Sequence, residues 1–118
     1  MAVRRAQDFV WKVPADIPLP EFAPEPDGSV CLDWIQSRRR LFVLSIGRTN
    51  RLAYAWVDGE DKGHGVVRFD GSNIPTQVLQ GIRSVTGPGN GPRDYELHKA
   101  QQLELANQIA KASELVLL

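Results

Sequence analysis

The stretch from Val30 to Phe69, VCLDWIQSRRRLFVLSIGRTNRLAYAWVDGEDKGHGVVRF, decides the fold. Along it, hydrophobic side chains alternate with polar or small ones in short runs, a two-residue period typical of β-strands. Turn-forming residues such as Gly47 and Asn50 separate the runs. We therefore expect an α+β fold with an antiparallel β-meander of about four strands over residues 30–69. The expected strands are Val30–Ile35, Leu41–Ile46, Leu52–Val57 and Val66–Phe69, and the polar and glycine-rich segment 58–65 is expected to be a mobile turn.

One amphipathic helix is predicted to follow the sheet over residues 75–86. Pro75 suits a first helical turn, and the apolar side chains then recur at helical spacing. In the run Leu52–Val57 the large side chains share one face and Ala53 and Ala55 share the other. Because a helix packs closely on small side chains, we expect this helix to lie over the two alanines.

The two ends of the chain differ from this core, which we place at residues 28–86. Residues 1–27 contain a proline-rich segment and are expected to form an extended arm across the core, a free tail or polyproline-type ligand being the alternatives. Residues 87–94, GPGNGPRD, are the strongest break in the sequence and are predicted to be a hinge.

Residues 95–118 form the last predicted unit, a helix over 95–117 free of glycine and proline. Its apolar stripe is narrow, and a helix isolated by a hinge gains too little from propensity to stand alone. It must therefore dock on the parent domain, on a second copy or on another protein, and our first hypothesis is that it serves association. The stripe consists of Leu105, Ile109, Ala112 and Val116.

The charges cancel, with 14 basic and 14 acidic residues among 118. A neutral total argues against a dedicated non-specific nucleic-acid binder. The single cysteine, Cys31, excludes an intramolecular disulfide and fits a reducing cytosol. No run is long and apolar enough for a signal peptide or a membrane span, so we expect a cytoplasmic protein.

The segment 38–57 nevertheless holds five arginines and no acid. They are Arg38, Arg39, Arg40, Arg48 and Arg51, and they are expected at the two ends of the strand Leu41–Ile46. Three interpretations stay open for this basic rim: an ordinary solubilising surface, contact with an acidic protein partner, or binding of nucleic acid.

Catalytic motifs are missing from the sequence, and no cofactor or small-molecule ligand is predicted. Asp58, Glu60, Asp61 and His64 form the one cluster of metal-ligand types, which we interpret as a solvated turn, so no metal site is predicted. Three other residues receive structural roles: Cys31 as a buried small hydrophobe, Asp33 as an ion-pair partner of an arginine, and His98 as a surface residue.

The strings DGSVCLDW, RRRLFVLSIG and RLAYAW resemble the sheet module of small bacterial proteins, a resemblance that implies a structural unit and no activity. Our first hypothesis is a non-enzymatic protein-binding module of the adaptor, inhibitor, immunity or antitoxin-like kind. It would act through its C-terminal helix and its sheet surface. The alternatives are a nucleic-acid-binding protein that uses the Arg38–Arg51 rim and a small enzyme of unknown class that uses Asp33, Asp58 or His64.

Overall fold

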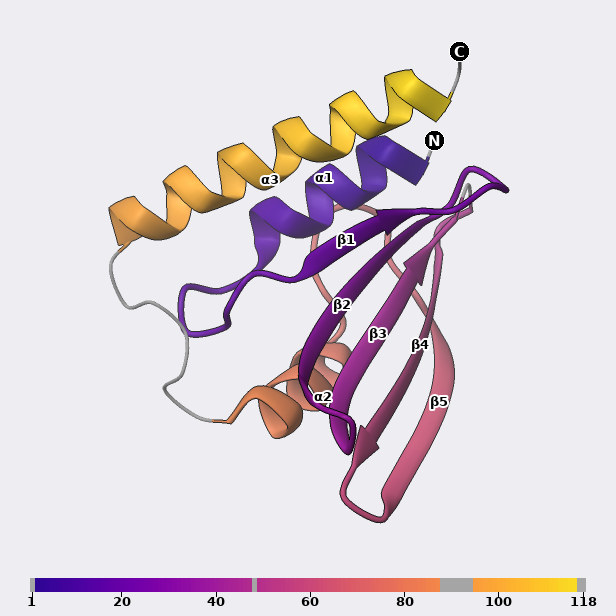
Figure 1. Cartoon of the computed structure of the whole chain (residues 1–118), viewed down its shortest axis with the longest axis vertical. Helices are drawn as coiled ribbons and strands as arrows, with labels where there is room; N and C mark the ends of the chain where they lie inside the picture. Colours follow the sequence, from indigo (N-terminus) through magenta and orange to yellow (C-terminus); the bar gives the residue numbers. More distant parts are fainter. Residues whose placement is uncertain (1, 48, 88–94, 117–118) are drawn as a thin grey trace.

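A computed structural model describes residues 2–47, 49–87 and 95–116 and gives five strands and three helices. The α+β class and the antiparallel meander are confirmed, with one strand more than expected. The elements are α1 (Ala2–Lys12), β1 (Glu21–Pro24), β2 (Val30–Ser37), β3 (Arg40–Ile46), β4 (Arg51–Asp58), β5 (Asp61–Arg68), α2 (Thr76–Thr86) and α3 (Tyr95–Val116). Neighbours in the sheet are neighbours in sequence, in the order β1-β2-β3-β4-β5 (Figure 1).

The register of the sheet assigns every strand residue to one of two faces. Leu32, Leu44 and Tyr54 are paired across β2, β3 and β4, and Gly65 of β5 continues the same row. Side chains alternate along a strand, so the residues of this row and those two or four positions away on each strand form one face, which we call the inner face. The residues between them, such as Val43 of β3, form the other face, which we call the open face.

The inner face carries the core, covered by α1 and α2. Phe9 of α1 packs edge-on against Phe69, with ring centroids 5.6 Å apart, and also contacts Trp34. On α2, a Cβ added to Gly81 would lie 2.6 Å from the ring of Phe42, so that glycine allows the helix to approach the sheet closely. Both helices therefore lie on the large aromatic side chains, and the expectation of a helix over Ala53 and Ala55 was wrong.

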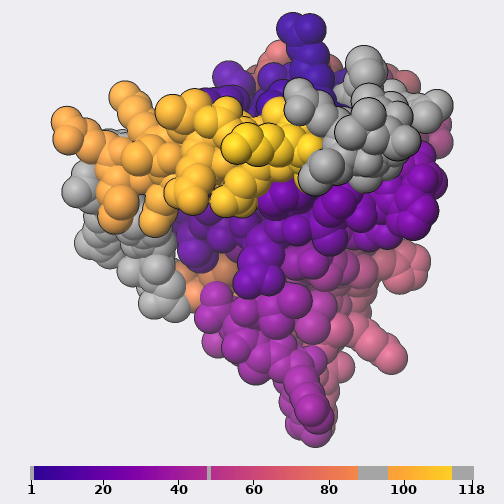
Figure 2. Space-filling view, turned by 45° about the horizontal axis from the view of Figure 1, so that its top comes forward, coloured from indigo at the N-terminus to yellow at the C-terminus, as the bar shows by residue number. Residues whose placement is uncertain are grey.

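The helix α3 packs on α1 and reaches the edge strand β1 (Figures 1 and 2). Two polar side chains fasten it to the end of α1. The Nε2 atom of Gln102 donates to the carbonyls of Val10 and Trp11 at 3.0 and 3.2 Å, and Nε2 of His98 lies 2.8 Å from the carbonyl of Val13. These contacts supply donors to carbonyls at the end of α1, where few backbone N–H groups remain to bond them. Both side chains are buried, so the surface position predicted for His98 was wrong.

The N-terminal 27 residues are less extended than predicted. Ala6, Phe9 and Val10 recur at helical spacing on the buried side of α1, and the prolines begin only after this helix. Farther along, the short strand β1 pairs with β2. It ends at Pro24, which an edge strand tolerates because that edge needs no donor for a further strand.

The strand β5 is also longer than predicted, since it takes in most of the segment expected to be a mobile turn. Gly63 and Gly65 make room on the inner face for two aromatic rings of β4. A Cβ on Gly63 would lie 2.8 Å from the ring of Trp56, and one on Gly65 would lie 2.6 Å from the hydroxyl of Tyr54. The glycines are thus sites of close cross-strand packing.

Candidate protein-binding face of the sheet

The open face carries a hydrophobic centre that the helices do not cover, since α1 and α2 both pack on the opposite side (Figure 1). Ile35 is 58% exposed and Val66 is 62% exposed, while Val43 in the middle is half-buried. Single exposed apolar side chains are ordinary, whereas a contiguous group is typical of an interaction surface. The register brings together Ile35, Leu41, Val43, Ala53, Ala55, Val57 and Val66.

Charge is sorted across this face from one edge to the other. The β1–β2 side carries acids. Glu21 is the cross-strand partner of Asp33. Just after β1, the N–H of Glu25 donates to the carbonyl of Ser29 at 2.9 Å, so Glu25 continues the same ladder. The β4–β5 side carries bases. They are Arg51, Lys62 and Arg68, together with His64. The apolar centre thus lies between an acidic edge and a basic edge.

The acidic edge raises the pKa values of two groups. Burial, followed by repulsion from Glu21 and Glu25, raises the pKa of Asp33. Burial and a hydrogen bond with Glu25 raise the pKa of the Cys31 thiol to about 11, so the thiolate that nucleophilic catalysis requires is scarce at neutral pH. Cys31 lies half-buried on the open face. Asp33 has Glu21 as its cross-strand neighbour in place of the arginine that we predicted.

The basic edge contains two arginines that face each other. Arg51 is the register partner of Arg68, and the neighbouring bond from Phe69 N to Asn50 O, at 2.7 Å, makes this a non-hydrogen-bonded pair with closely spaced side chains. Like charges directly opposite each other destabilise a sheet. Neither arginine takes part in the ion pairs found among the described residues. This arrangement suits an external anion such as a carboxylate.

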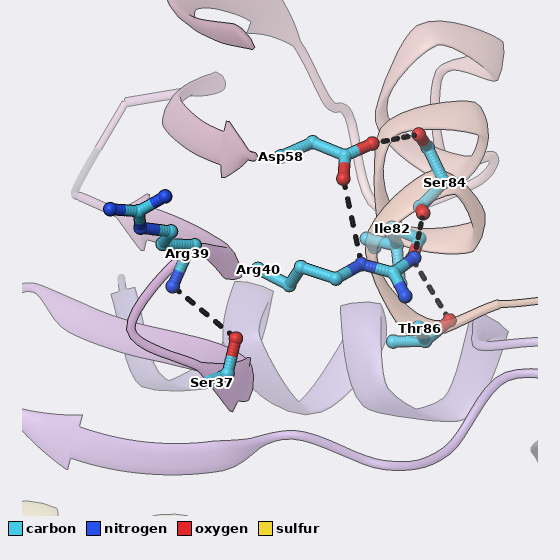
Figure 3. A network of polar contacts seen from close by, with 7 residues as sticks. All are labelled: Ser37, Arg39, Arg40, Asp58, Ile82, Ser84 and Thr86. Atoms are coloured by element: carbon cyan, nitrogen blue, oxygen red, sulfur yellow. Dashed lines mark hydrogen bonds and ion pairs between the residues drawn. The ribbon is translucent and has the colours of Figure 1, made fainter. Parts of the chain in front are cut away.

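Arg40, by contrast, has a structural role (Figure 3). Its Nη2 donates to the carbonyl of Ser84 near the end of α2 at 2.8 Å, and its Nε lies 3.5 Å from Oδ1 of Asp58. The hydroxyl of Ser84 donates to the other carboxylate oxygen of Asp58 at 3.2 Å. Arg40 therefore joins α2 to the end of the β3–β4 pair.

The predicted basic rim is divided into separate parts. Arg38 and Arg39 lie in the exposed β2–β3 turn, whose backbone bonds to the acidic β4–β5 turn through Gly59 N and Arg39 O at 2.7 Å. Arg51 lies at the far end of the sheet, about 20 Å away along the strands. Arg48 lies outside the described residues. The structure thus brings acids beside Arg38–Arg40 and separates that group from Arg51.

The predicted stripe of α3 lies largely inside the protein. Leu105 and Ile109 are 7% and 1% exposed and belong to the hydrophobic core, and Ala112 is half-buried. The side chain of Val116 lies outside what the structure describes. Leu105 and Ile109 therefore stabilise the docking of α3 on its own chain. Docking on the parent domain was one of the alternatives left open, but α1 as the docking surface was missed, although the helical spacing in both segments is visible in the sequence.

The metal-ligand types found in the sequence do not converge. Within the described ranges, no group of three or more histidine, cysteine or acidic side chains is placed to hold a metal ion. Asp58 and Asp61 are paired at the β4–β5 turn, whereas His64 lies beside Ala55 on the open face. The helices of the described part also lack the length and apolarity needed to cross a membrane.

Comparisons of the chain with protein-family models, with curated proteins and with solved structures found no match. The open face is the surface on which the described residues bring together an apolar centre and sorted charges. A functional assignment therefore depends on the chemistry of this face.

Proposed function

We propose that this chain is a non-enzymatic protein-binding module of the cytoplasm that acts through the open face of its sheet. The observation that supports the proposal is the group of apolar side chains around Val43, which no helix of the described chain covers. An apolar centre with charged margins has the composition of a protein interface. Adaptor, inhibitor, immunity and antitoxin-like proteins act by such surface contact.

The dimensions of the open face suit a protein partner. Strands spaced about 4.8 Å apart with lengths of about 25 Å give this face a planar area of roughly 500 Å². A partner that covers this face would bury about this area on each protein. The total buried area is then roughly 1,000 Å², at the lower bound of specific protein interfaces. A small-molecule site would instead require a concave pocket.

The charges favour protein over nucleic acid. A nucleic-acid surface needs a continuous positive area to neutralise successive phosphates. Here the acids Glu21, Glu25 and Asp33 occupy one edge of the face, and the arginines of the predicted rim lie at opposite ends of the strands. A phosphate backbone crossing the face would meet both signs of charge.

The test is site-specific photocrosslinking in the native cell. A benzophenone amino acid replaces Val43 on the open face, and the matched control places it at Gln80, which is exposed on α2. We expect a discrete protein adduct from position 43 and none from position 80. A nucleic-acid adduct from position 43, or equal labelling from both positions, would contradict the proposal.

A further inference from the structure

We infer that the occupant of the open face is a second copy of this chain, related by a two-fold axis that runs parallel to β3. This inference rests on the proposed function and names its partner. Two sheets would pack face to face about 10 Å apart with their strands aligned to within about 30°. The positions of the charges on the open face favour this arrangement.

A two-fold axis along β3 reverses the order of the strands and keeps each residue at its level along them. The strand β1 then lies opposite β5 of the second copy, β2 lies opposite β4, and β3 lies opposite itself. Glu21 shares a row of the register with His64, through Asp33, Val43 and Ala55. The axis therefore places Glu21 opposite the second copy's His64.

The same axis also brings opposite charges together in a second row of the sheet. The ladder pairs Glu25 with Ser29, and this row continues to the arginine pair of β4 and β5. The axis places Glu25 opposite the second copy's Arg68, and Ser29 opposite its Arg51. Each contact occurs twice in the dimer, because an isologous interface repeats every contact. The unpaired arginines thus gain a carboxylate.

The two-fold axis along β3 also brings apolar side chains of the two copies together. Val43 lies on the axis and meets its own copy, and Leu41 of the same strand does the same. Ile35 of β2 shares a row with Val57 of β4, so these two meet across the interface. The rows of Val43 and Leu41 thus close on β3 with identical side chains, whereas the axis places Asp33 of β2 opposite the second copy's Ala55, next to its His64.

The charge pattern excludes the other in-plane axis. A two-fold axis perpendicular to the strands keeps the strand order and lays β1 over β1 and β5 over β5. It brings Glu21, Asp33 and Glu25 of one copy against the same acids of the other, and the arginine pair against basic residues. Juxtaposed like charges are strongly unfavourable at an interface. The sorted charges therefore select the axis along β3.

Charge reversal at Glu25 and Arg68 tests this geometry by sedimentation equilibrium over about 1–100 µM protein. Glu25→Arg alone creates two repulsive contacts, and Arg68→Glu alone does the same. We expect each to weaken the dimer by about tenfold or more. An equimolar mixture of the two variants makes only attractive contacts, so we expect a heterodimer close to wild-type affinity.

The matched control is Glu104→Arg, a reversal of the same kind on the exposed outer side of α3, which should leave the dimer unchanged. Circular dichroism and thermal unfolding check that each variant folds. A wild-type protein that is monomeric at about 100 µM overturns the second-copy inference, and so does a dimer insensitive to both single reversals or not restored in the mixture.

The protein-binding function and the second-copy inference are contradicted by different results. A monomer whose position 43 still crosslinks to a different protein contradicts the second copy and keeps the protein-binding function. A monomer without any protein adduct at position 43 contradicts both. A dimer formed through the free edge of β5 would tolerate Val43→Arg, a result that also overturns the face-to-face arrangement.

Discussion

The two faces of the sheet differ in what covers them, although the sequence makes both of them hydrophobic. On β3, Phe42 and Leu44 point inward and are 0% and 1% exposed, whereas Val43 between them points outward and is half-buried. A strand that is apolar on both sides is typical of a sheet covered on both sides. The described residues provide helices for one face only, so their packing explains the inner face and leaves the open face unexplained.

The largest expected effect comes from truncating the inner face. Phe42→Ala removes a ring that contacts Trp34, Tyr54 and α2, and we expect it to lower the free energy of unfolding by about 3–5 kcal/mol. Val43→Ala is the neighbouring control on the open face and should cost less than about 1 kcal/mol in the monomer. Urea unfolding at low protein concentration measures both. Equal costs would contradict the contrast between the faces.

The second prediction concerns the layer that covers the inner face. Gln102→Ala removes the donor that satisfies the carbonyls of Val10 and Trp11 in a buried site. The carbonyl of Val10 keeps its bond from the N–H of Val13 at 3.3 Å, so we expect a loss of about 1–2 kcal/mol and faster hydrogen exchange in α3. Gln101→Ala, one residue earlier and exposed, should change neither quantity. Unchanged exchange in the Gln102 variant would show that this side chain does not fasten α3 to α1.

The third prediction concerns the packing of β5. Gly63→Ala places a methyl group 2.8 Å from the ring of Trp56, and we expect the displaced ring to cost about 1–2 kcal/mol. Gly47→Ala is the control, because a Cβ there meets nothing within 4 Å. Thermal unfolding and tryptophan fluorescence, to which Trp56 contributes together with Trp11 and Trp34, report on the change. If the two variants melt alike, Trp56 does not depend on Gly63 for its place.

The smallest effect is electrostatic and depends on pH. A bidentate hydrogen bond with Arg83, at 2.9 and 3.1 Å, lowers the pKa of Asp16 and ties the segment after α1 to α2. Since the pKa is lower in the folded state, this stabilisation is present above about pH 4 and is lost as the pH falls through the folded-state pKa. Both side chains are about half exposed, so we expect Asp16→Asn to cost less than about 1 kcal/mol at pH 7.

Acid titration of the unfolding free energy checks that sign. The wild-type protein and the Asp16→Asn variant should differ at pH 7 and converge as the pH falls through the folded-state pKa of Asp16. Arg83→Gln should give the same convergence, because it removes the other half of the ion pair. A difference that grows on acidification would contradict the assigned interaction.

The sequence predicted the sheet well because its alternation is local. It predicted the faces poorly, since alternation alone does not say which side a helix covers, and the alanines of β4 favoured the wrong side. The helix α1 was missed because prolines follow Ala2–Lys12 closely. The charge pattern of the open face could not be predicted from the sequence. It depends on the strand register, which places Glu25 and Arg68 in one row although they are far apart in the chain.

The contacts of the predicted site residues could likewise not be predicted from the sequence. Leu105 and Ile109 were identified as apolar side chains in need of cover, yet the sequence does not say that the cover is α1, about a hundred residues earlier. Arg40 was grouped with the other arginines by composition, and its contacts with Ser84 and Asp58 depend on the packing of α2.

The pairing of the first helix with the last has a consequence for synthesis. Gln7 of α1 bonds to the backbone of Ala106 in α3, across 99 positions of the chain. As the chain leaves the ribosome, the meander is complete while α3 is still inside the exit tunnel. One apolar side of α1 is therefore exposed to solvent until α3 has left the tunnel. A nascent chain stalled before residue 95 would be the form most in need of a chaperone.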